Sequence, residues 1–160
     1  MNSLDRKLAE TEPLKKRNWI KLISMLKLQS NEWAIAKLTQ GGFEDFKIAY
    51  MPVLMNITPD GINNNELADQ ARVTKQAMSK VAKELQKRGY IRSTIDTRDK
   101  RSTVIMLTDR GKKLVIEARM HVTDLCNEYR ALVGRTEFDK ATEILKAIMV
   151  YNDQKLLAKK

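Results

Sequence analysis

The sequence predicts a mainly α-helical chain with one small β-hairpin, and three observations support this α+β class. Apolar residues recur at helical spacing near both ends of the chain, over about residues 14–38 and 114–156. Two short helical segments share residues 66–85. Strand-like runs at 90–95 and 102–108 flank a charged hexapeptide, DTRDKR. With 160 residues, 42 % hydrophobic and 31 % charged, the chain has the composition of a globular protein, and we expect a single domain over residues 1–160.

The first long helix is predicted to start at Thr11-Glu12-Pro13, with Pro13 in its first turn, and to stop at Gly41-Gly42. A second helix is expected over residues 53–57, starting around 49–52 because proline is tolerated only in a first turn. Thr58-Pro59-Asp60-Gly61 then has proline and glycine where a turn accepts them.

Residues 66–85, ELADQARVTKQAMSKVAKEL, predict two short helices joined by a turn. Asn64 or Asn65 is a suitable N-cap for the first helix, and Thr74 for the second. Gly89 is placed to end the second helix. Apolar residues define the buried faces, namely Leu67, Ala68 and Ala71 in the first helix and Met78, Val81, Ala82 and Leu85 in the second. This is the pattern of a helix-turn-helix, except that Arg72 stands in the turn where glycine is common.

The second of these helices has a polar outer face, as expected of a recognition helix that enters a DNA groove. Gln76 could pair with adenine through two hydrogen bonds, whereas the lysines would mostly meet phosphate. The candidate DNA-binding residues of this helix are Thr74, Lys75, Gln76, Ser79, Lys80 and Lys83. Two antiparallel helices of an ordinary bundle would show a similar pattern, so the helices alone are a weak signal.

A strand pair directly after a recognition-type helix predicts the wing of a winged helix. The charge distribution agrees with a polyanionic partner, because residues 66–113 carry 13 Lys/Arg against 6 Asp/Glu, a surplus of +7 within a net charge of +10. A lysine-rich solvated surface is the alternative explanation of this charge.

Two long helices are expected after the wing. Thr108 can cap the first, which runs to Val133 and is stopped by Gly134, and Thr136 opens the second. The apolar residues of these helices could pack the protomer's own core or form an interface with a second copy.

At the level of motifs the chain resembles the MarR family of bacterial transcriptional regulators. The most specific feature is the D-x-R-D-x-R wing signature, present as Asp96, Arg98, Asp99 and Arg101. The second is LTDRGK, residues 107–112, which closes the wing. The resemblance covers about residues 40–135 well and the flanking helices only by length and pattern.

The resemblance implies a winged helix-turn-helix lobe over residues 42–111, flanked by helical dimerisation regions over 13–40 and 112–160. It implies a homodimer that binds a pseudo-palindromic double-stranded operator, commonly as a repressor, and it leaves room for a small-molecule effector. In the wing, Arg98, Lys100 and Arg101 become DNA-binding candidates, with Arg98 directed to the minor groove, while Asp96 and Asp99 would brace the loop.

Other classes find less support. The chain has no glycine-rich phosphate loop, one histidine (His121) and one cysteine (Cys126), so we expect no enzyme, no metal and no cofactor. Cys126 is expected to be a small buried hydrophobe rather than a redox switch. Without a secretory signal or an apolar run of membrane-spanning length, a cytoplasmic, nucleoid-associated protein is expected and no membrane partner. The alternative function is a winged helix that binds RNA or protein without operator specificity.

Overall fold

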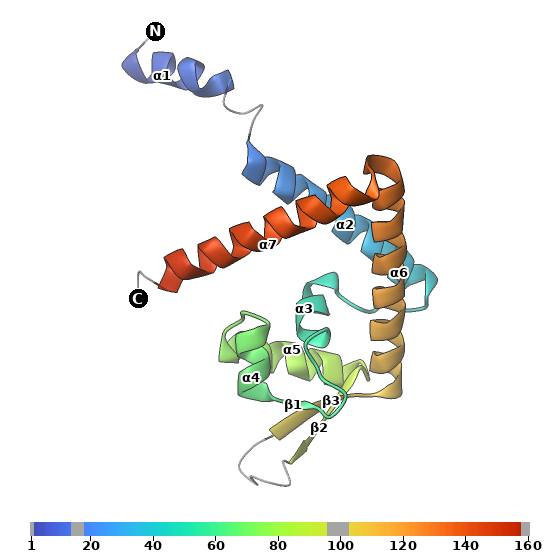
Figure 1. The fold of residues 1–160 in the computed structure, drawn as a ribbon. Coiled ribbons are helices and arrows are strands. Elements are labelled where there is room, and N and C mark those ends of the chain that lie inside the picture. The colour runs from blue at the N-terminus through green and yellow to red at the C-terminus, as the bar shows by residue number, and fades with distance from the viewer. Residues whose placement is uncertain (1, 14–17, 96–102, 158–160) are drawn as a thin grey trace. The chain divides into compact units, whose positions relative to one another are not determined.

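The computed structural model describes residues 2–13, 18–95 and 103–157. The chain forms two compact units, residues 1–114 and 115–160, and each is described by itself. The fold is mainly helical with one small antiparallel sheet, which confirms the predicted class (Figure 1). Among the described residues, no helix is long and apolar enough to cross a membrane.

The first two helices precede the helix-turn-helix region, and the prediction for this part was wrong at its start. Helix α1 (Ser3–Thr11) was not expected; it begins with a capping box in which Asn2 accepts from the Asp5 amide and Asp5 accepts from the Asn2 amide. Helix α2 (Trp19–Gln40) begins at Trp19 rather than at Pro13, because the Asn18 side chain caps it by accepting from the Lys21 amide at 3.0 Å.

The segment between α2 and the helix-turn-helix contains a short 3-10 helix η2 (Ile48–Tyr50), helix α3 (Met51–Leu54) and strand β1 (Ile62–Asn63). Helix α3 ends at Leu54, three residues before the expected end. The turn Thr58–Gly61 is confirmed, since the Gly61 amide donates to the Thr58 carbonyl at 3.0 Å.

The helix-turn-helix consists of α4 (Asn64–Gln70) and α5 (Lys75–Lys87). Thr74 is the N-cap of α5, as predicted. The N-cap of α4 is Asn63, one residue before the two candidates, and its side chain accepts from the Asn65 amide at 2.8 Å.

The wing strands β2 (Ile91–Ile95) and β3 (Thr103–Leu107) pair antiparallel, with Ile91 opposite Leu107 and Ile95 opposite Thr103. The predicted two-stranded hairpin is in fact part of a three-stranded sheet of order β1-β3-β2, because β1 pairs with β3 through Ile62 and Ile105. A run of two residues is too short to show the apolar–polar alternation of a strand, so the sequence did not predict β1.

The core of the first unit gathers apolar side chains from helices α3, α4, α5 and α6 and from the three strands. Helices α4 and α5 contribute the faces expected of them, and the strands contribute one residue each. The innermost side chains, all with at most 2 % of their surface exposed, are Val53, Leu54, Leu67, Met78, Leu85, Tyr90, Ile91, Ile105 and Leu114.

Helix α6 (Asp109–Val133) starts in the first unit and continues into the second, where it is followed by α7 (Arg135–Leu157). Gly134 separates the two helices, as predicted, and adopts φ +96°, a left-handed conformation that favours glycine. Helix α7 begins at Arg135, one residue before the expected start. Across this hairpin the Tyr129 and Phe138 rings lie 6.2 Å apart, and Arg130 pairs with Asp139 at 3.2 Å.

Candidate nucleic-acid interface

Helix α5 is fixed to the lobe by one face and exposes the other. Met78 and Leu85 are fully buried, whereas Gln76, Ser79, Lys80 and Lys83 project from the opposite face and are exposed. Thr74 and Lys75, at the start of the helix, are exposed as well. The structure therefore brings all six predicted recognition-helix residues to the surface of one helix.

Two of these six residues already make hydrogen bonds within the helix. The Thr74 hydroxyl accepts from the Ala77 amide at 3.1 Å, and the Ser79 hydroxyl donates to the Lys75 carbonyl at 3.0 Å. Thr74 thus has a structural task as the N-cap, and its hydroxyl is only partly available to a ligand.

The cations of α5 fall into two groups. Lys75, Lys80, Lys83 and Lys87 are exposed, and none of them forms an ion pair with any residue that the structure describes. Arg88, at the C-terminal end, instead folds back onto the lobe and pairs with Glu84 at 3.3 Å. The lysines are therefore available to a polyanion, while Arg88 is a structural residue.

The turn between α4 and α5 is a complete Schellman motif. The Val73 amide donates to the Ala68 carbonyl at 3.0 Å, and the Arg72 amide donates to the Asp69 carbonyl at 3.1 Å. Arg72 occupies the left-handed position with φ 54°, where glycine would be free of strain. The prediction that this turn manages without a glycine is confirmed.

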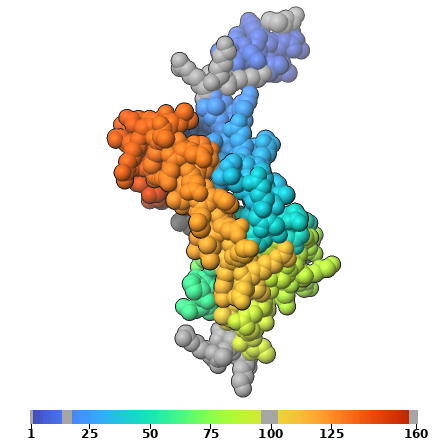
Figure 2. All heavy atoms as spheres, turned by 90° about the vertical axis from the view of Figure 1, so that its right-hand side faces the viewer, coloured from blue at the N-terminus to red at the C-terminus, as the bar shows by residue number. Residues whose placement is uncertain are grey.

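A cluster that the sequence did not predict lies at the C-terminal end of α5. It joins the loop before η2, the residue before β2 and the first turn of α6. The Asp45 carboxylate accepts hydrogen bonds from the Tyr90 hydroxyl at 2.6 Å and from Arg110 at 2.9 Å. The Arg110 guanidinium lies over the Tyr90 ring, 4.5 Å from its centroid. Figure 2 shows the cyan to teal segment around residues 41–50 lying against the yellow-green end of α5 and β2. Asp45 and Tyr90 are 45 residues apart in the sequence, so no local sequence pattern predicts the cluster.

The surroundings of the cluster shift two pKa values. Burial raises the pKa of the Asp45 carboxyl, but the hydrogen bond from Tyr90 and the Arg110 charge outweigh it, so the pKa lies below its ordinary value. Burial, together with the hydrogen bond to Asp45, raises the pKa of Tyr90 far above its ordinary value. Both shifts favour the state with an ionised Asp45 and a neutral Tyr90.

The LTDRGK element closes the wing onto the end of α5. The Thr108 hydroxyl donates to the Gly89 carbonyl at 2.5 Å and accepts from the Gly111 amide at 3.1 Å, so Thr108 caps α6 as predicted. The Thr108 amide donates to the Tyr90 carbonyl at 3.1 Å. A Cβ atom at Gly111 would collide with that same carbonyl oxygen, which gives the glycine of this motif a steric reason.

The predicted wing residues Asp96, Arg98, Asp99, Lys100 and Arg101 lie outside the described residues. The strands that lead to them, β2 and β3, are described and paired. The roles assigned to the wing tip stay predictions.

In the second unit, Cys126 is half-buried and lies in a shallow hollow beside Arg130 and Phe138. The hollow is also lined by Asp139, Lys140, Thr142, Glu143 and Lys146. The part of the chain that the structure describes contains no group of three or more His, Cys, Asp or Glu residues that could hold a metal ion.

Comparisons with known proteins agree with this geometry. Residues 58–103, from the turn before β1 to the first residue of β3, match the model of the MarR family. The transcriptional regulator AdcR of Streptococcus pyogenes is 26 % identical over 102 residues, which cover 64 % of this chain and 69 % of that protein.

Solved structures give the same result. A MarR transcriptional regulator from Methanosarcina mazei Go1 has a TM-score of 0.69 and 25 % identity, covering 85 % of this chain and 96 % of that one. The transcriptional repressor CouR, solved with a 23-mer DNA duplex, has a TM-score of 0.71 and 22 % identity, covering 87 % and 96 %.

A helix-turn-helix with a polar recognition helix, followed by a wing hairpin, defines a winged helix-turn-helix transcriptional regulator. The match over residues 58–103 and the similarity to a MarR transcriptional regulator confirm the resemblance to the MarR family. Because the relatives are transcriptional regulators, these comparisons also confirm the prediction that the protein is not an enzyme.

Proposed function

We propose that this protein is a repressor that binds a pseudo-palindromic operator in double-stranded DNA as a homodimer. The observation that carries the proposal is the outer face of α5, where four exposed lysines have no ion-pair partner among the described residues. A solvated surface is usually interlaced with charges of both signs, whereas a row of unpaired cations beside Gln76 suits a duplex with its phosphates and base edges.

Within this proposal the six residues divide by role. Gln76, in the first turn of α5, would read a base edge, with adenine as the preferred partner. Lys75, Lys80 and Lys83 would contact phosphates, and Ser79 would contact either. Thr74 would act through its capping of α5 and through contacts at the groove edge.

The wing would contribute the second contact. Arg98 is proposed to enter the minor groove, Lys100 and Arg101 to approach phosphate, and Asp96 and Asp99 to hold the loop in shape. Replacing Arg98 by alanine is then expected to lower affinity and to relax preference for A·T pairs flanking the major-groove site. Unchanged affinity and preference in that variant would remove the wing from the proposal.

A gel shift tests the function itself. The protein is titrated against the upstream region of its own gene, with unrelated duplex and structured RNA as competitors. We expect retention of the upstream fragment in the presence of unrelated duplex and a steep loss of affinity with salt. RNA preference, or indifference to sequence, would favour the alternative of an RNA- or protein-binding winged helix.

The homodimer is supported by apolar side chains that α2 and α7 leave uncovered. On α2, Trp19, Leu22 and Leu26 are about half exposed. On α7, Leu145, Ile148 and Met149 are exposed at helical spacing. Apolar surface of this extent on two long helices is typical of an interface. A second copy is the occupant we propose, because a pseudo-palindrome needs two recognition helices.

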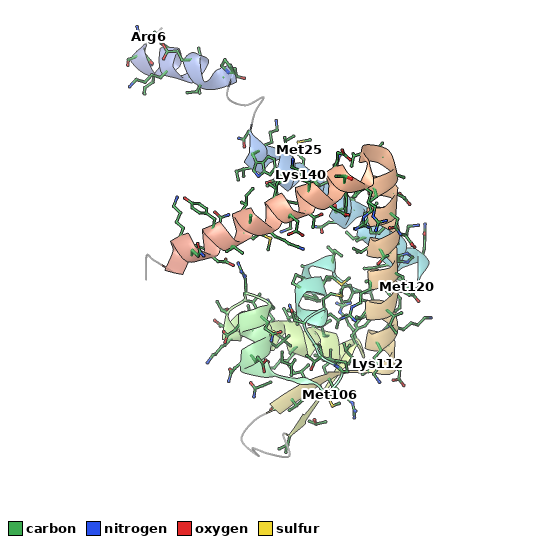
Figure 3. The ribbon with its side chains drawn as sticks, viewed as in Figure 1. Arg6, Met25, Met106, Lys112, Met120 and Lys140 are labelled. Carbon is green, nitrogen blue, oxygen red and sulfur yellow. The ribbon has the colours of Figure 1, made fainter. Side chains whose placement is uncertain are left out.

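Light scattering tests the dimer. The wild-type chain is expected to have twice the protomer mass at micromolar concentration, and Ile148→Asp is expected to yield monomer. Lys140→Asp, on the same helix at an exposed polar position labelled in Figure 3, is the control and should remain dimeric. A monomeric wild type would exclude the dimer. Release of DNA by a small-molecule effector belongs to the same proposal and is tested by adding candidate ligands to the gel shift.

A further inference from the structure

The cluster of Asp45, Tyr90 and Arg110 is attached to the C-terminal turn of the recognition helix. Arg88, the C-cap of α5, donates to the Asp45 carbonyl at 2.5 Å, and its own carbonyl accepts from Arg110 at 2.8 Å. Arg110 therefore caps the negative end of the helix with a cation. Helix α5 is thus bonded at this end both to the loop before η2 and to the first turn of α6.

The hydrogen bonds of the cluster involve charged groups, and such bonds are strong and fix the orientation of the side chains that they join. The Asp45 carboxylate receives two charge-assisted hydrogen bonds, and the guanidinium of Arg110 reaches both Asp45 and the Arg88 carbonyl while lying on the Tyr90 ring. The Tyr90 ring is itself completely buried and packs edge-on against Phe46 at 5.2 Å. These bonds hold the C-terminal end of α5 against the loop before η2, the residue before β2 and the first turn of α6.

Of the α5 residues proposed to meet DNA, all but Lys83 lie in the other half of the helix or at its N-cap. Helix α5 is thirteen residues long, which corresponds to about 20 Å at a rise of 1.5 Å per residue. A tilt of about 5° at the anchored end would displace the first turn by roughly 2 Å, more than a bidentate base contact tolerates. An anchor at this end of α5 would therefore set the geometry of base reading from outside the contact surface.

We propose that Asp45 and Arg110 are positioning residues for DNA binding, which hold α5 at the angle required for sequence-specific recognition. The inference rests on the proposed function, because it concerns how the same helix reads its operator. It goes beyond that function by assigning a role to residues outside the recognition helix and the wing.

Two variants weaken the anchor to different degrees. Asp45→Asn removes the charge that Arg110 and Tyr90 share, and Tyr90→Phe removes only the hydroxyl while keeping the ring packed. Each is expected to weaken binding to the upstream fragment by about tenfold, the order of one lost base contact. Binding to unrelated duplex should change little, and the salt slope should stay the same, because every proposed phosphate contact is retained.

The matched control is Asp109→Asn. Asp109 also pairs with a cation in the first turn of α6, Lys112 at 3.2 Å, but this pair is exposed, and neither residue forms an ion pair or hydrogen bond with α5 in the described part of the chain. Figure 3 labels Lys112 at this position. The control makes the same chemical change on a neighbouring ion pair and is expected to leave both affinity and specificity unchanged.

Arg110→Gln separates positioning from direct contact. If Arg110 acts through Asp45, the double variant with Asp45→Asn should bind no more weakly than the weaker single variant. A salt slope that falls by about one per protomer in Arg110→Gln alone would mean that Arg110 contacts phosphate, and this would overturn the inference.

The remaining outcomes are equally decisive when binding is measured well below the melting temperature. If Asp45→Asn and Tyr90→Phe melt earlier but bind as tightly as wild type, the cluster is merely structural and the inference fails. If operator and unrelated duplex weaken equally, positioning for specificity is excluded. A wild-type protein that shows no preference for the upstream fragment contradicts the proposed function instead, which keeps the two failures distinguishable.

Discussion

Single residues determine whether neighbouring segments of the lobe can pack together, and Gly111 is the clearest case. We predict that Gly111→Ala destabilises the protein by about 1–3 kcal/mol, because the added methyl group collides with the Tyr90 carbonyl oxygen and the backbone must shift. Urea unfolding followed by circular dichroism measures the change. Lys112→Ala, one residue further on the exposed side, is the control and is expected to cost less than about 1 kcal/mol.

Arg72 is the converse case, because it carries a side chain at a left-handed backbone position that favours glycine. Its left-handed conformation costs a non-glycine residue about 1–2 kcal/mol, partly offset by the greater entropy that glycine loses on folding. Arg72→Gly is therefore expected to leave the midpoint of thermal unfolding unchanged or to raise it by a few degrees. Arg72→Ala keeps the strain and serves as the comparison; greater stability of the alanine variant would contradict this account of the turn.

At the scale of the element, α5 combines two independent faces. The buried face fixes the helix through Met78 and Leu85, and the exposed face carries the lysines, so each face can be changed without the other. This separation is what makes the helix suitable for recognition, since sequence on the outer face is free to vary with the ligand.

We predict that Lys80→Gln and Lys83→Gln each reduce the slope of log affinity against log salt by about one per protomer, with stability unchanged. The loss should be similar for specific and unrelated duplexes, because a phosphate contact carries no sequence information. Gln86, exposed on the same helix nearer its end, offers the control Gln86→Ala. Titrations at several salt concentrations decide whether either lysine meets phosphate.

At the scale of the whole molecule, the Asp45 cluster couples folding to pH. The folded-state pKa of Asp45 lies below its ordinary value of 3.8, so its contribution to stability is present above about pH 4 and is lost as pH falls through the lower, folded value. The folded-state pKa of Tyr90 is raised above 10.0, so its contribution is present below pH 10 and is lost as pH rises beyond it.

The difference in unfolding free energy between wild type and Asp45→Asn should therefore be constant at neutral pH and shrink in acid. The difference between wild type and Tyr90→Phe should shrink only in alkali. Urea titrations across this range measure both differences. A difference for Asp45→Asn that grows as pH falls would show that the carboxylate is not stabilised by its partners.

Much of the lobe could be predicted because its signals are local. The caps at Thr74 and Thr108, the left-handed residue at Gly134 and the strands on either side of DTRDKR each follow from neighbours within a few residues. Helix α1, the start of α2 at Trp19 and the two-residue strand β1 were not predicted. The starts of α1 and α2 depend on which asparagine, Asn2 or Asn18, caps a helix, and β1 depends on a pairing made across the lobe.

The recognition helix, with its buried and exposed faces, and the resemblance to the MarR family were determined by the sequence itself, because helical periodicity and a compact wing motif lie in consecutive residues. Only the tertiary structure decided what holds that helix in place. Asp45 and Arg110 are 65 residues apart, and no periodicity links them. Their contact exists because the loop before η2 and the start of α6 both pack against Tyr90, so it follows from the packing of the whole lobe.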